Sequence, residues 1–175
     1  MKWVLILPIV IIGIIIVIYT NKPKKQDIVT DKVVKQGMIL SSSQGLQAPN
    51  SNFSEYHLGS QDLSNSDFHN SNFSKADLSN VNLSNSNLQF CDFSETNLTN
   101  TNFTNSDLTG STFGTLATLN NTNFTNTNLT GVTLPIRLNG GNFTNANFEL
   151  VNFCGIDLGG AILTGYKNGV PCKNS

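Results

Sequence analysis

Charged residues are scarce in this 175-residue chain, at 12% of the composition, and it has only two histidines, three cysteines and one tryptophan. The ten basic and eleven acidic residues leave a net charge of −1, which excludes a general electrostatic attraction to nucleic acid. A disordered chain normally has strong charge or abundant proline, and this chain has neither. Asparagine, serine and threonine replace the charged residues, and such a composition is typical of a repeat.

The same scarcity removes most catalytic chemistry. His57 and His69 fall at unrelated outward positions, and no other histidine is present to complete a metal site or a nucleophile–base pair. The sequence also lacks a nucleophile-elbow motif and a glycine-rich phosphate loop. We therefore expect no enzyme activity, no metal and no cofactor.

The first part of the chain differs from the rest. Residues 3–19 form an uncharged apolar run that starts at Trp3 and ends at Tyr19. As a helix this run is about 26 Å long, close to the ~30 Å hydrocarbon core of a bilayer, and aromatic residues at both ends favour the interfaces. The pattern predicts a single-pass transmembrane signal-anchor helix within residues 1–20. A cleaved signal peptide is the alternative, but Ile18–Tyr19 and the following residues make a poor cleavage site.

The side of the membrane that the body faces stays open. Residues 21–50 are expected to form a polar linker and an N-terminal cap, and the three lysines that closely follow the apolar run slightly favour a cytoplasmic body. Residues 1–50 have a net charge of +4, whereas residues 51–165 carry nine acids against two bases, a net of −7.

A leucine or phenylalanine recurs every five residues from Phe53 to Leu163, in 23 units that span residues 51–165. The period shifts once by an extra residue within Thr112–Thr118 and once by a missing residue within Pro135–Arg137, and we expect a bulge or loop at each. The residue two before each centre is small or β-branched, and the residue one before it is mostly Asn or Asp. A period of five fits neither a continuous helix nor a continuous strand.

The pattern fits if each unit is three extended residues and a two-residue corner. The centre and the small residue then point inward, while the Asn or Asp between them points outward. Every fourth centre is mostly phenylalanine and the next is always leucine, which predicts a four-sided coil of about 20 residues with two structural core ladders. The first ladder is Phe53, Phe73, Phe93, Phe113 and Phe153, and the second is Leu58, Leu78, Leu98, Leu119, Leu138 and Leu158.

The tandem order of small residue, Asn or Asp, and Leu or Phe resembles the pentapeptide-repeat family, as in Ala76–Asp77–Leu78 and Ala146–Asn147–Phe148. The resemblance implies an all-β fold, a right-handed quadrilateral β-helix of about six coils over residues 51–165. Residues 166–175 would then form a C-terminal cap, because both ends of a solenoid need covers.

Two modifications depend on the compartment. Cys91 is expected in the core, whereas a Cys154–Cys172 disulfide would pin the tail in an oxidising compartment, the alternative being two free thiols. The repeat also creates glycosylation sequons, which matter only if the body is lumenal or outside. The sequon asparagines are Asn52, Asn72, Asn82, Asn97, Asn102, Asn120, Asn123, Asn128 and Asn142.

The function expected from these features is a membrane-anchored, non-enzymatic interaction or structural scaffold, whose protein partner and oligomeric state the sequence does not give. The resemblance implies one alternative, a DNA-mimicking topoisomerase-binding protein of the quinolone-resistance type. A net charge of −7 over a rod of about 25–30 Å is one charge per ~4 Å, while duplex DNA carries one per ~1.7 Å. The charge density therefore favours the scaffold, and nucleic acid is not an expected partner.

Overall fold

The computed structural model describes residues 9–11, 14–16, 40–41 and 45–168. Strands β1 (Ile9–Ile11) and β2 (Ile14–Ile16) pair antiparallel, with Ile9 opposite Ile16. Strands β3 (Leu40–Ser41) and β4 (Gly45–Leu46) form a second antiparallel pair, with Leu40 opposite Leu46. From β4 onward the chain forms one coil built from short parallel bridges.

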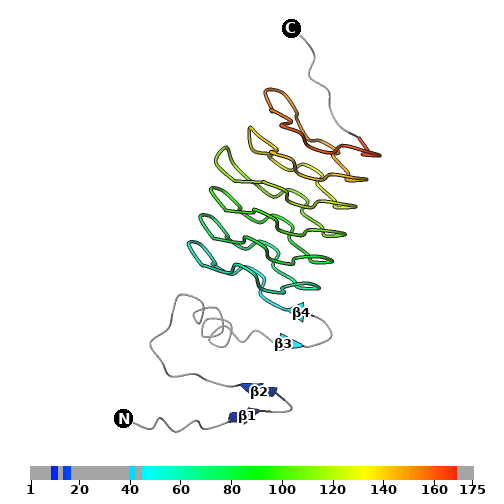
Figure 1. Ribbon diagram of the computed structural model, residues 1–175. Coiled ribbons are helices and arrows are strands. Elements are labelled where there is room, and N and C mark those ends of the chain that lie inside the picture. The colour runs from blue at the N-terminus through cyan, green and yellow to red at the C-terminus, as the bar shows by residue number, and fades with distance from the viewer. Residues whose placement is uncertain (1–8, 12–13, 17–39, 42–44, 169–175) are drawn as a thin grey trace.

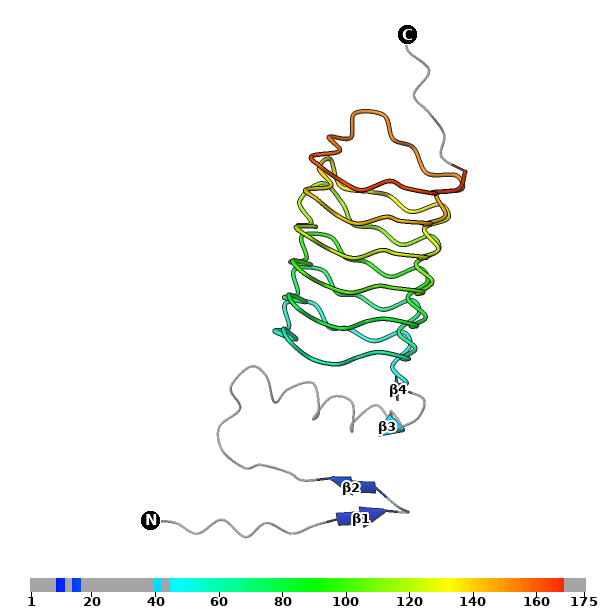
Figure 2. The same ribbon diagram turned by 45° about the vertical axis from the view of Figure 1, so that its right-hand side comes forward.

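The coil confirms the predicted all-β solenoid. Parallel bridges join residues 20 positions apart, such as Asn52 to Asn72 and Asn72 to Asp92, so four five-residue units complete one turn. Figures 1 and 2 show the successive turns stacked along one axis. We name the four sides by their centres. Wall 1 is centred on Phe53, Phe73, Phe93, Phe113, Leu134 and Phe153; wall 2 on Leu58, Leu78, Leu98, Leu119, Leu138 and Leu158; wall 3 on Leu63, Leu83, Phe103, Phe124, Phe143 and Leu163; and wall 4 on Phe68, Leu88, Leu108, Leu129 and Phe148.

One unit shows why five residues suffice. The Ala76 N–H donates to the Phe73 carbonyl at 3.0 Å and closes a turn in which Lys75 has a φ of 60°. This left-handed corner conformation favours Asn and Gly, which occupy most of the equivalent positions. The Asn72 side-chain oxygen accepts the Ser74 N–H at 2.8 Å, and this local bond explains why Asn or Asp precedes nearly every centre.

The core is a stack of centres along each wall. The wall 1 rings of Phe73 and Phe93 are parallel, with centroids 5.3 Å apart, and Phe113 continues the stack at 5.2 Å. All but two of the predicted ladder residues are buried. Phe153 is partly buried and Leu158 is 43% exposed, because both lie in the last described coil.

Hydroxyl groups at the small inward positions complete the interior. Thr96 donates its hydroxyl to the Phe73 carbonyl at 2.8 Å, and Thr101 donates to the Leu78 carbonyl at 2.7 Å. Each hydroxyl thus donates to a carbonyl of the preceding coil. Among the described residues no buried side-chain nitrogen or oxygen lacks a partner, so polar atoms enter this narrow core at little cost.

The coil extends beyond the predicted limits of 51 and 165. Gln47 bridges Asp67, and Ala48, which occupies the centre position of that unit, is fully buried. At the other end Lys167 bridges Asn147. Alanine replaces leucine or phenylalanine in the first unit, so the periodicity of large apolar residues begins one unit later than the coil.

The extra residue and the missing residue lie on the same corner, between walls 1 and 2, in successive coils. Bridges that span the extra residue join residues 21 apart, such as Asn97 to Thr118, and bridges that span the missing residue join residues 19 apart. Gly114 to Leu116 form a three-residue turn, while Pro135 and Ile136 replace a normal corner. Within the described coil, walls 3 and 4 keep their bridges, whereas Thr118–Arg137 and Thr133–Asn152 are not bridged.

Of the helix predicted over residues 3–19, only residues 9–11 and 14–16 are described, and the rest lies outside the described residues. The described part of that run, β1 and β2, is extended, because its isoleucine and valine residues are β-branched and favour strands. Among the residues that the structure describes, no helix has the length and apolar character needed to cross a bilayer.

Candidate interaction surface

Each histidine lies near one aspartate. His57 lies 3.8 Å from Asp77 on wall 2, and His69 lies 2.8 Å from Asp67 on wall 4. Within residues 45–168 no three His, Cys, Asp or Glu side chains gather closely enough to hold a metal ion.

Aspartates at the outward positions accept hydrogen bonds within the turns. Partial burial of Asp77 works to raise the pKa of its carboxyl, but hydrogen bonds from Ser79 and the nearby His57 outweigh burial, so this pKa is lowered. The pKa of Asp62 is lowered by the hydroxyl and the N–H of Ser64.

Lowered carboxyl pKa values predict acid sensitivity. A carboxyl whose pKa is lower in the folded chain stabilises it above the unfolded pKa of about 3.9, and this contribution is lost as pH falls through the folded pKa. We expect the melting temperature to fall between about pH 4 and pH 2, and to fall less in Asp77→Asn, whose amide oxygen still accepts the Ser79 N–H. Thermal melts of both chains at stepwise pH check this, and parallel curves would contradict it.

The cysteines occupy different environments. Cys91 is buried, its thiol donates to the Phe68 carbonyl at 3.1 Å, and burial raises its pKa to about 12. Cys154 is exposed on the last coil and disulfide-bonded. Cys172 lies outside the described residues, so its pairing stays a prediction.

The sequon asparagines are mostly engaged within the outer ladders. Asn102, for example, donates its amide to the Asn82 side-chain oxygen at 3.1 Å. Asn52 and Asn120 are exposed. Glycosylation stays a prediction. The sequon asparagines whose side-chain amides donate to an earlier coil are Asn82, Asn97, Asn102, Asn123, Asn128 and Asn142.

Acidic side chains are spread around the coil. Each wall carries at least one, and on wall 4 Asp67 and Asp107 are separated by Asn87. No wall of the described coil presents the continuous column of acids that a mimic of the DNA backbone would require. The wall acids are Asp62, Asp67, Asp77, Asp92, Asp107 and Asp157, and the corner acids are Glu55, Glu95 and Glu149.

Exposed apolar side chains gather around wall 1. Phe90 (59% exposed) and Leu150 (74%) lie on the corner between walls 4 and 1, and Leu116 (69%) and Ile136 (51%) lie on the corner between walls 1 and 2. The other large exposed apolar residues of the described coil, Leu158, Ile162 and Tyr166, belong to its last turn. We call wall 1 with these four corner residues the framed face.

One side of the framed face is the corner between walls 4 and 1, which carries Phe90 and Leu150. Backbone bonds from the Phe90, Gly110 and Gly131 nitrogens hold this corner in register across successive coils. Phe90 and Leu150 have φ values of 56° and 61°, and Gly110 and Gly131 stand between them. The Phe90 ring lies over Gly110, where a Cβ atom would come within 2.7 Å of the ring.

Sequence reasoning missed the four framing residues because they stand in corners, outside the pattern of large centres. The signal was present. Elsewhere the second corner position is mostly Asn or Gly, so Phe90 and Leu150 depart from the corner pattern. Large apolar side chains are also unusual in an exposed turn.

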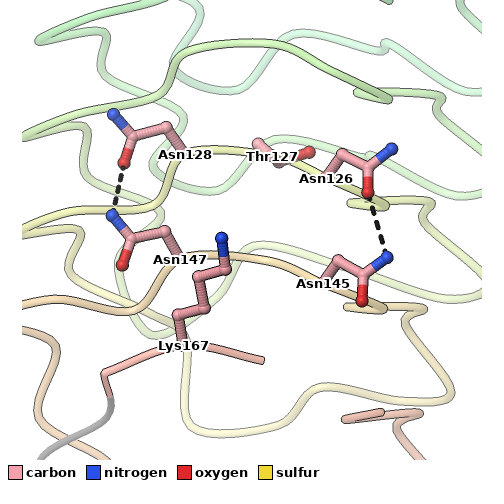
Figure 3. Close-up of a pocket in the computed structure, with 6 residues that line it drawn as sticks. All are labelled: Asn126, Thr127, Asn128, Asn145, Asn147 and Lys167. Carbon is pink, nitrogen blue, oxygen red and sulfur yellow. Dashed lines mark hydrogen bonds between the residues drawn. The ribbon is translucent and has the colours of Figure 1, made fainter. Parts of the chain in front are cut away.

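A polar pocket of about 490 Å³ lies between walls 3 and 4 (Figure 3). Two amide pairs line it, Asn145 to Asn126 at 3.2 Å and Asn147 to Asn128 at 3.3 Å, and Lys167 extends between them. The amides of the lining hydrogen-bond to one another, and Lys167 is its only ionic group. The pocket holds no acid–base pair.

Comparison with known sequences identifies the repeat. The model of the pentapeptide repeats matches eight copies, over residues 51–89, 76–114 and 136–165, which together exceed half of the chain. The chain belongs to the pentapeptide repeat family. The matched ranges omit residues 115–135, where the extra and missing residues of the repeat fall. No curated protein matches the sequence.

The chain is similar to solved pentapeptide repeat structures. The protein Rfr23 from the cyanobacterium Cyanothece 51142 is 21% identical, with a TM-score of 0.50, over 71% of this chain and 82% of its own. A thylakoid lumen protein from Arabidopsis thaliana is 31% identical, with a TM-score of 0.34, over 50% and 68%. QnrB1, a plasmid-mediated fluoroquinolone resistance protein, is 17% identical, with a TM-score of 0.40, over 70% and 77%.

Proposed function

We propose that this pentapeptide repeat protein is a rigid, non-enzymatic scaffold that binds a protein partner on the framed face and is attached to a membrane through residues 3–19. The observation that carries the docking proposal is the placement of Phe90, Leu116, Ile136 and Leu150 around one wall. The outward residues of wall 1, such as Asp92 and Thr112, are polar, and the exposed apolar side chains at its corners can anchor a partner that lies across the wall.

Backbone conformation supports a role for two of these residues. A left-handed φ costs an ordinary side chain about 1–2 kcal/mol relative to the right-handed region, and Asn or Gly avoids most of this cost. Phe90 and Leu150 therefore oppose stability while exposing apolar surface. Strained residues that expose apolar side chains are typical of binding sites.

The surroundings of the framed face favour a partner segment with apolar and basic side chains. Asp92 on wall 1 is acidic, and the adjoining corners carry three glutamates against one lysine. With Arg137 beside Ile136, acids outnumber bases four to two. These corner residues are Glu55, Lys75, Glu95 and Glu149. Complementary charge speeds and orients docking, and apolar anchors supply most of the affinity. The spread of acids over all four walls favours this scaffold over a DNA mimic.

Replacing Phe90 and Leu150 with asparagine separates binding from folding. Because asparagine suits the left-handed corner, Leu150→Asn should raise the melting temperature by a few degrees. Phe90→Asn should change it little, because loss of the ring's contact with Gly110 offsets the relief of backbone strain. A photo-crosslinker at Thr112, on the framed face, should give one adduct of constant mass in the native membrane preparation, and the double variant should lose it.

The matched control places the crosslinker at Asn102 on wall 3. Equal adducts from Thr112 and Asn102, or an adduct that survives the double variant, would refute docking on the framed face. The purified chain should leave gyrase supercoiling unchanged, and inhibition would favour the DNA mimic instead.

The membrane attachment rests on the uncharged run from Trp3 to Tyr19. The chain should remain with membranes after alkaline carbonate extraction, whereas Ile11→Asp, a charge in the centre of the run, should move it to the supernatant. Release of both chains into the supernatant to the same degree would overturn the attachment. The crosslinking assay tests the framed face separately.

A further inference from the structure

The corner between walls 2 and 3 loosens along the coil. In its first coils the second corner residue donates its N–H to a carbonyl of the next coil at 2.9 Å. The following bond, from Asn121 to Asn139, is 3.4 Å long. Within residues 45–168 the Gly140 N–H, which the register would pair with the Gly159 carbonyl, has no hydrogen-bond partner. The regular donors of this corner are Ser60, Asn80 and Asn100.

The residue before this corner explains the loosening. Thr99, at the first corner position, donates its N–H to the Asn97 side-chain oxygen at 3.2 Å. Arg137 stands in the place of Asn97 two coils later, and arginine has no acceptor oxygen, so Asn139 lacks this bond. The bridge between Thr118 and Arg137 is also missing. The corner at Asn139 therefore loses both its local bond and its bond to the next coil.

Asn139 and Gly140 form an Asn–Gly pair, one of two in the sequence. The other, Asn168–Gly169, extends beyond the described residues. Asn139 is exposed, and its side chain makes no hydrogen bond to any residue of the described coil. Glycine has no side chain to crowd its own nitrogen, so this nitrogen can approach the side-chain carbonyl of the preceding asparagine. An exposed amide and an unpaired N–H thus stand next to each other.

The other asparagines are protected by the bonds that build the coil. From Asn50 to Asn147, each asparagine of the described coil other than Asn139 is followed by a residue whose N–H donates a hydrogen bond. Ala146, for example, follows Asn145 and donates to the Phe143 carbonyl at 3.0 Å. A bonded N–H must lose its partner before its nitrogen can attack, which slows the attack about fivefold for an ordinary bond.

We propose that Asn139 is a site of spontaneous deamidation through a succinimide formed with Gly140. The Gly140 nitrogen gives its proton to hydroxide and bonds to the side-chain carbonyl carbon of Asn139, which releases its amide nitrogen as ammonia. Water then opens the ring at either carbonyl and leaves aspartate or isoaspartate, so water is the only reagent consumed and no atom is oxidised or reduced. Isoaspartate adds a methylene to the main chain of this corner. The proposal is independent of the framed face, which lies along other corners.

A second Asn–Gly pair, placed on a bonded N–H, separates the effect of the fold from that of the sequence. Ala146→Gly creates such a pair after Asn145 and removes only a methyl group, while the N–H at position 146 keeps its acceptor, the Phe143 carbonyl. The full chain with this substitution is incubated at mildly alkaline pH, in native buffer and in urea. Peptide fragmentation in the mass spectrometer assigns each gain in mass to Asn139 or Asn145, and circular dichroism verifies the fold.

In native buffer Asn139 should deamidate about fivefold faster than Asn145, or more, because only the second pair has a bonded N–H. In urea the two rates should become similar, since the coil no longer holds either pair. Equal rates in the folded chain would overturn the proposal. So would an Asn139 that stays intact in the folded chain and deamidates only in urea.

The succinimide itself is tested in the chain without Ala146→Gly. Gly140→Ser should slow the deamidation of Asn139, because the serine side chain crowds the attacking nitrogen, and Ser60 shows that this corner position accepts serine at a φ of 63°. The products from the original chain should include isoaspartate, which only ring opening provides. An unchanged rate in Gly140→Ser, or aspartate without isoaspartate, would mean direct hydrolysis of the side chain and would refute the role of Gly140.

Discussion

Replacing Phe93 with aspartate should abolish cooperative folding of the middle coils. The ring is fully buried between Phe73 and Phe113, and its removal alone costs about 3–5 kcal/mol. The carboxylate would also lose its hydration, because the phenylalanine stack offers no cation and no free donor. The sum approaches or exceeds the 5–15 kcal/mol by which ordinary domains are stable.

The matched control is Asn97→Asp, one unit later and outward. The new carboxylate still accepts the Thr99 N–H, but it loses the bond that Asn97 donates to Asp77 at 3.1 Å and brings two negative charges together. Such cross-strand repulsion costs up to about 1 kcal/mol. Denaturant melts followed by circular dichroism compare the two chains. Similar losses would contradict the assignment of inward and outward positions.

The walls could be predicted from the sequence, because each centre must be buried and therefore apolar. A residue such as Phe93 or Leu98 is apolar because it is fully buried inside the coil, and the spacing of 20 between like centres equals the observed bridge spacing. The Asn or Asp before each centre was predicted to face outward. Its bond to the N–H two residues later, as in Asn72 and Ser74, adds the physical reason for the choice.

The ends and the framed face could not be predicted in the same way. Ala48 occupies a centre position and is fully buried, but alanine is not part of the pattern of leucine and phenylalanine. Phe90 and Leu116 stand outside the periodic pattern altogether, so only the path of the chain shows that their corners flank the same wall. Around Ile11 the apolar run predicted a helix, yet β-branched residues suit a strand equally well.

The two interruptions of the repeat bear on the framed face. The one-residue insertion is absorbed in its own corner by the three-residue turn at Gly114 to Leu116, since the next centres, Leu119 and Phe124, stay fully buried. The deletion at Pro135–Arg137 restores the count within one turn, and the corner where both occur carries Leu116 and Ile136. Wall 3 keeps its bridges throughout, from Asp62 to Ile162. The interruption is therefore a local change of one corner, which leaves the scaffold intact and adds apolar surface beside wall 1.

Replacing Gly110 with alanine should destabilise the coil more than the same change at Gly131. Both glycines have left-handed φ values, 69° and 65°, so each alanine costs about 1 kcal/mol of backbone strain. A Cβ at Gly110 would come within 2.7 Å of the Phe90 ring, whereas no atom lies within 4 Å of a Cβ at Gly131. We expect about 2–3 kcal/mol for Gly110→Ala, since the ring must leave its contact with the backbone.

A double-mutant cycle identifies the contact. With Phe90→Asn in place, Gly110→Ala should cost no more than Gly131→Ala, because the colliding ring is gone. Thermal melts of the four chains measure the coupling, at about 4 °C for each kcal/mol. Equal costs for the two glycines in the original chain would mean that the ring moves aside freely. The Phe90 side chain would then be no fixed part of the framed face, and partner binding would have to rest on Leu116, Ile136 and Leu150.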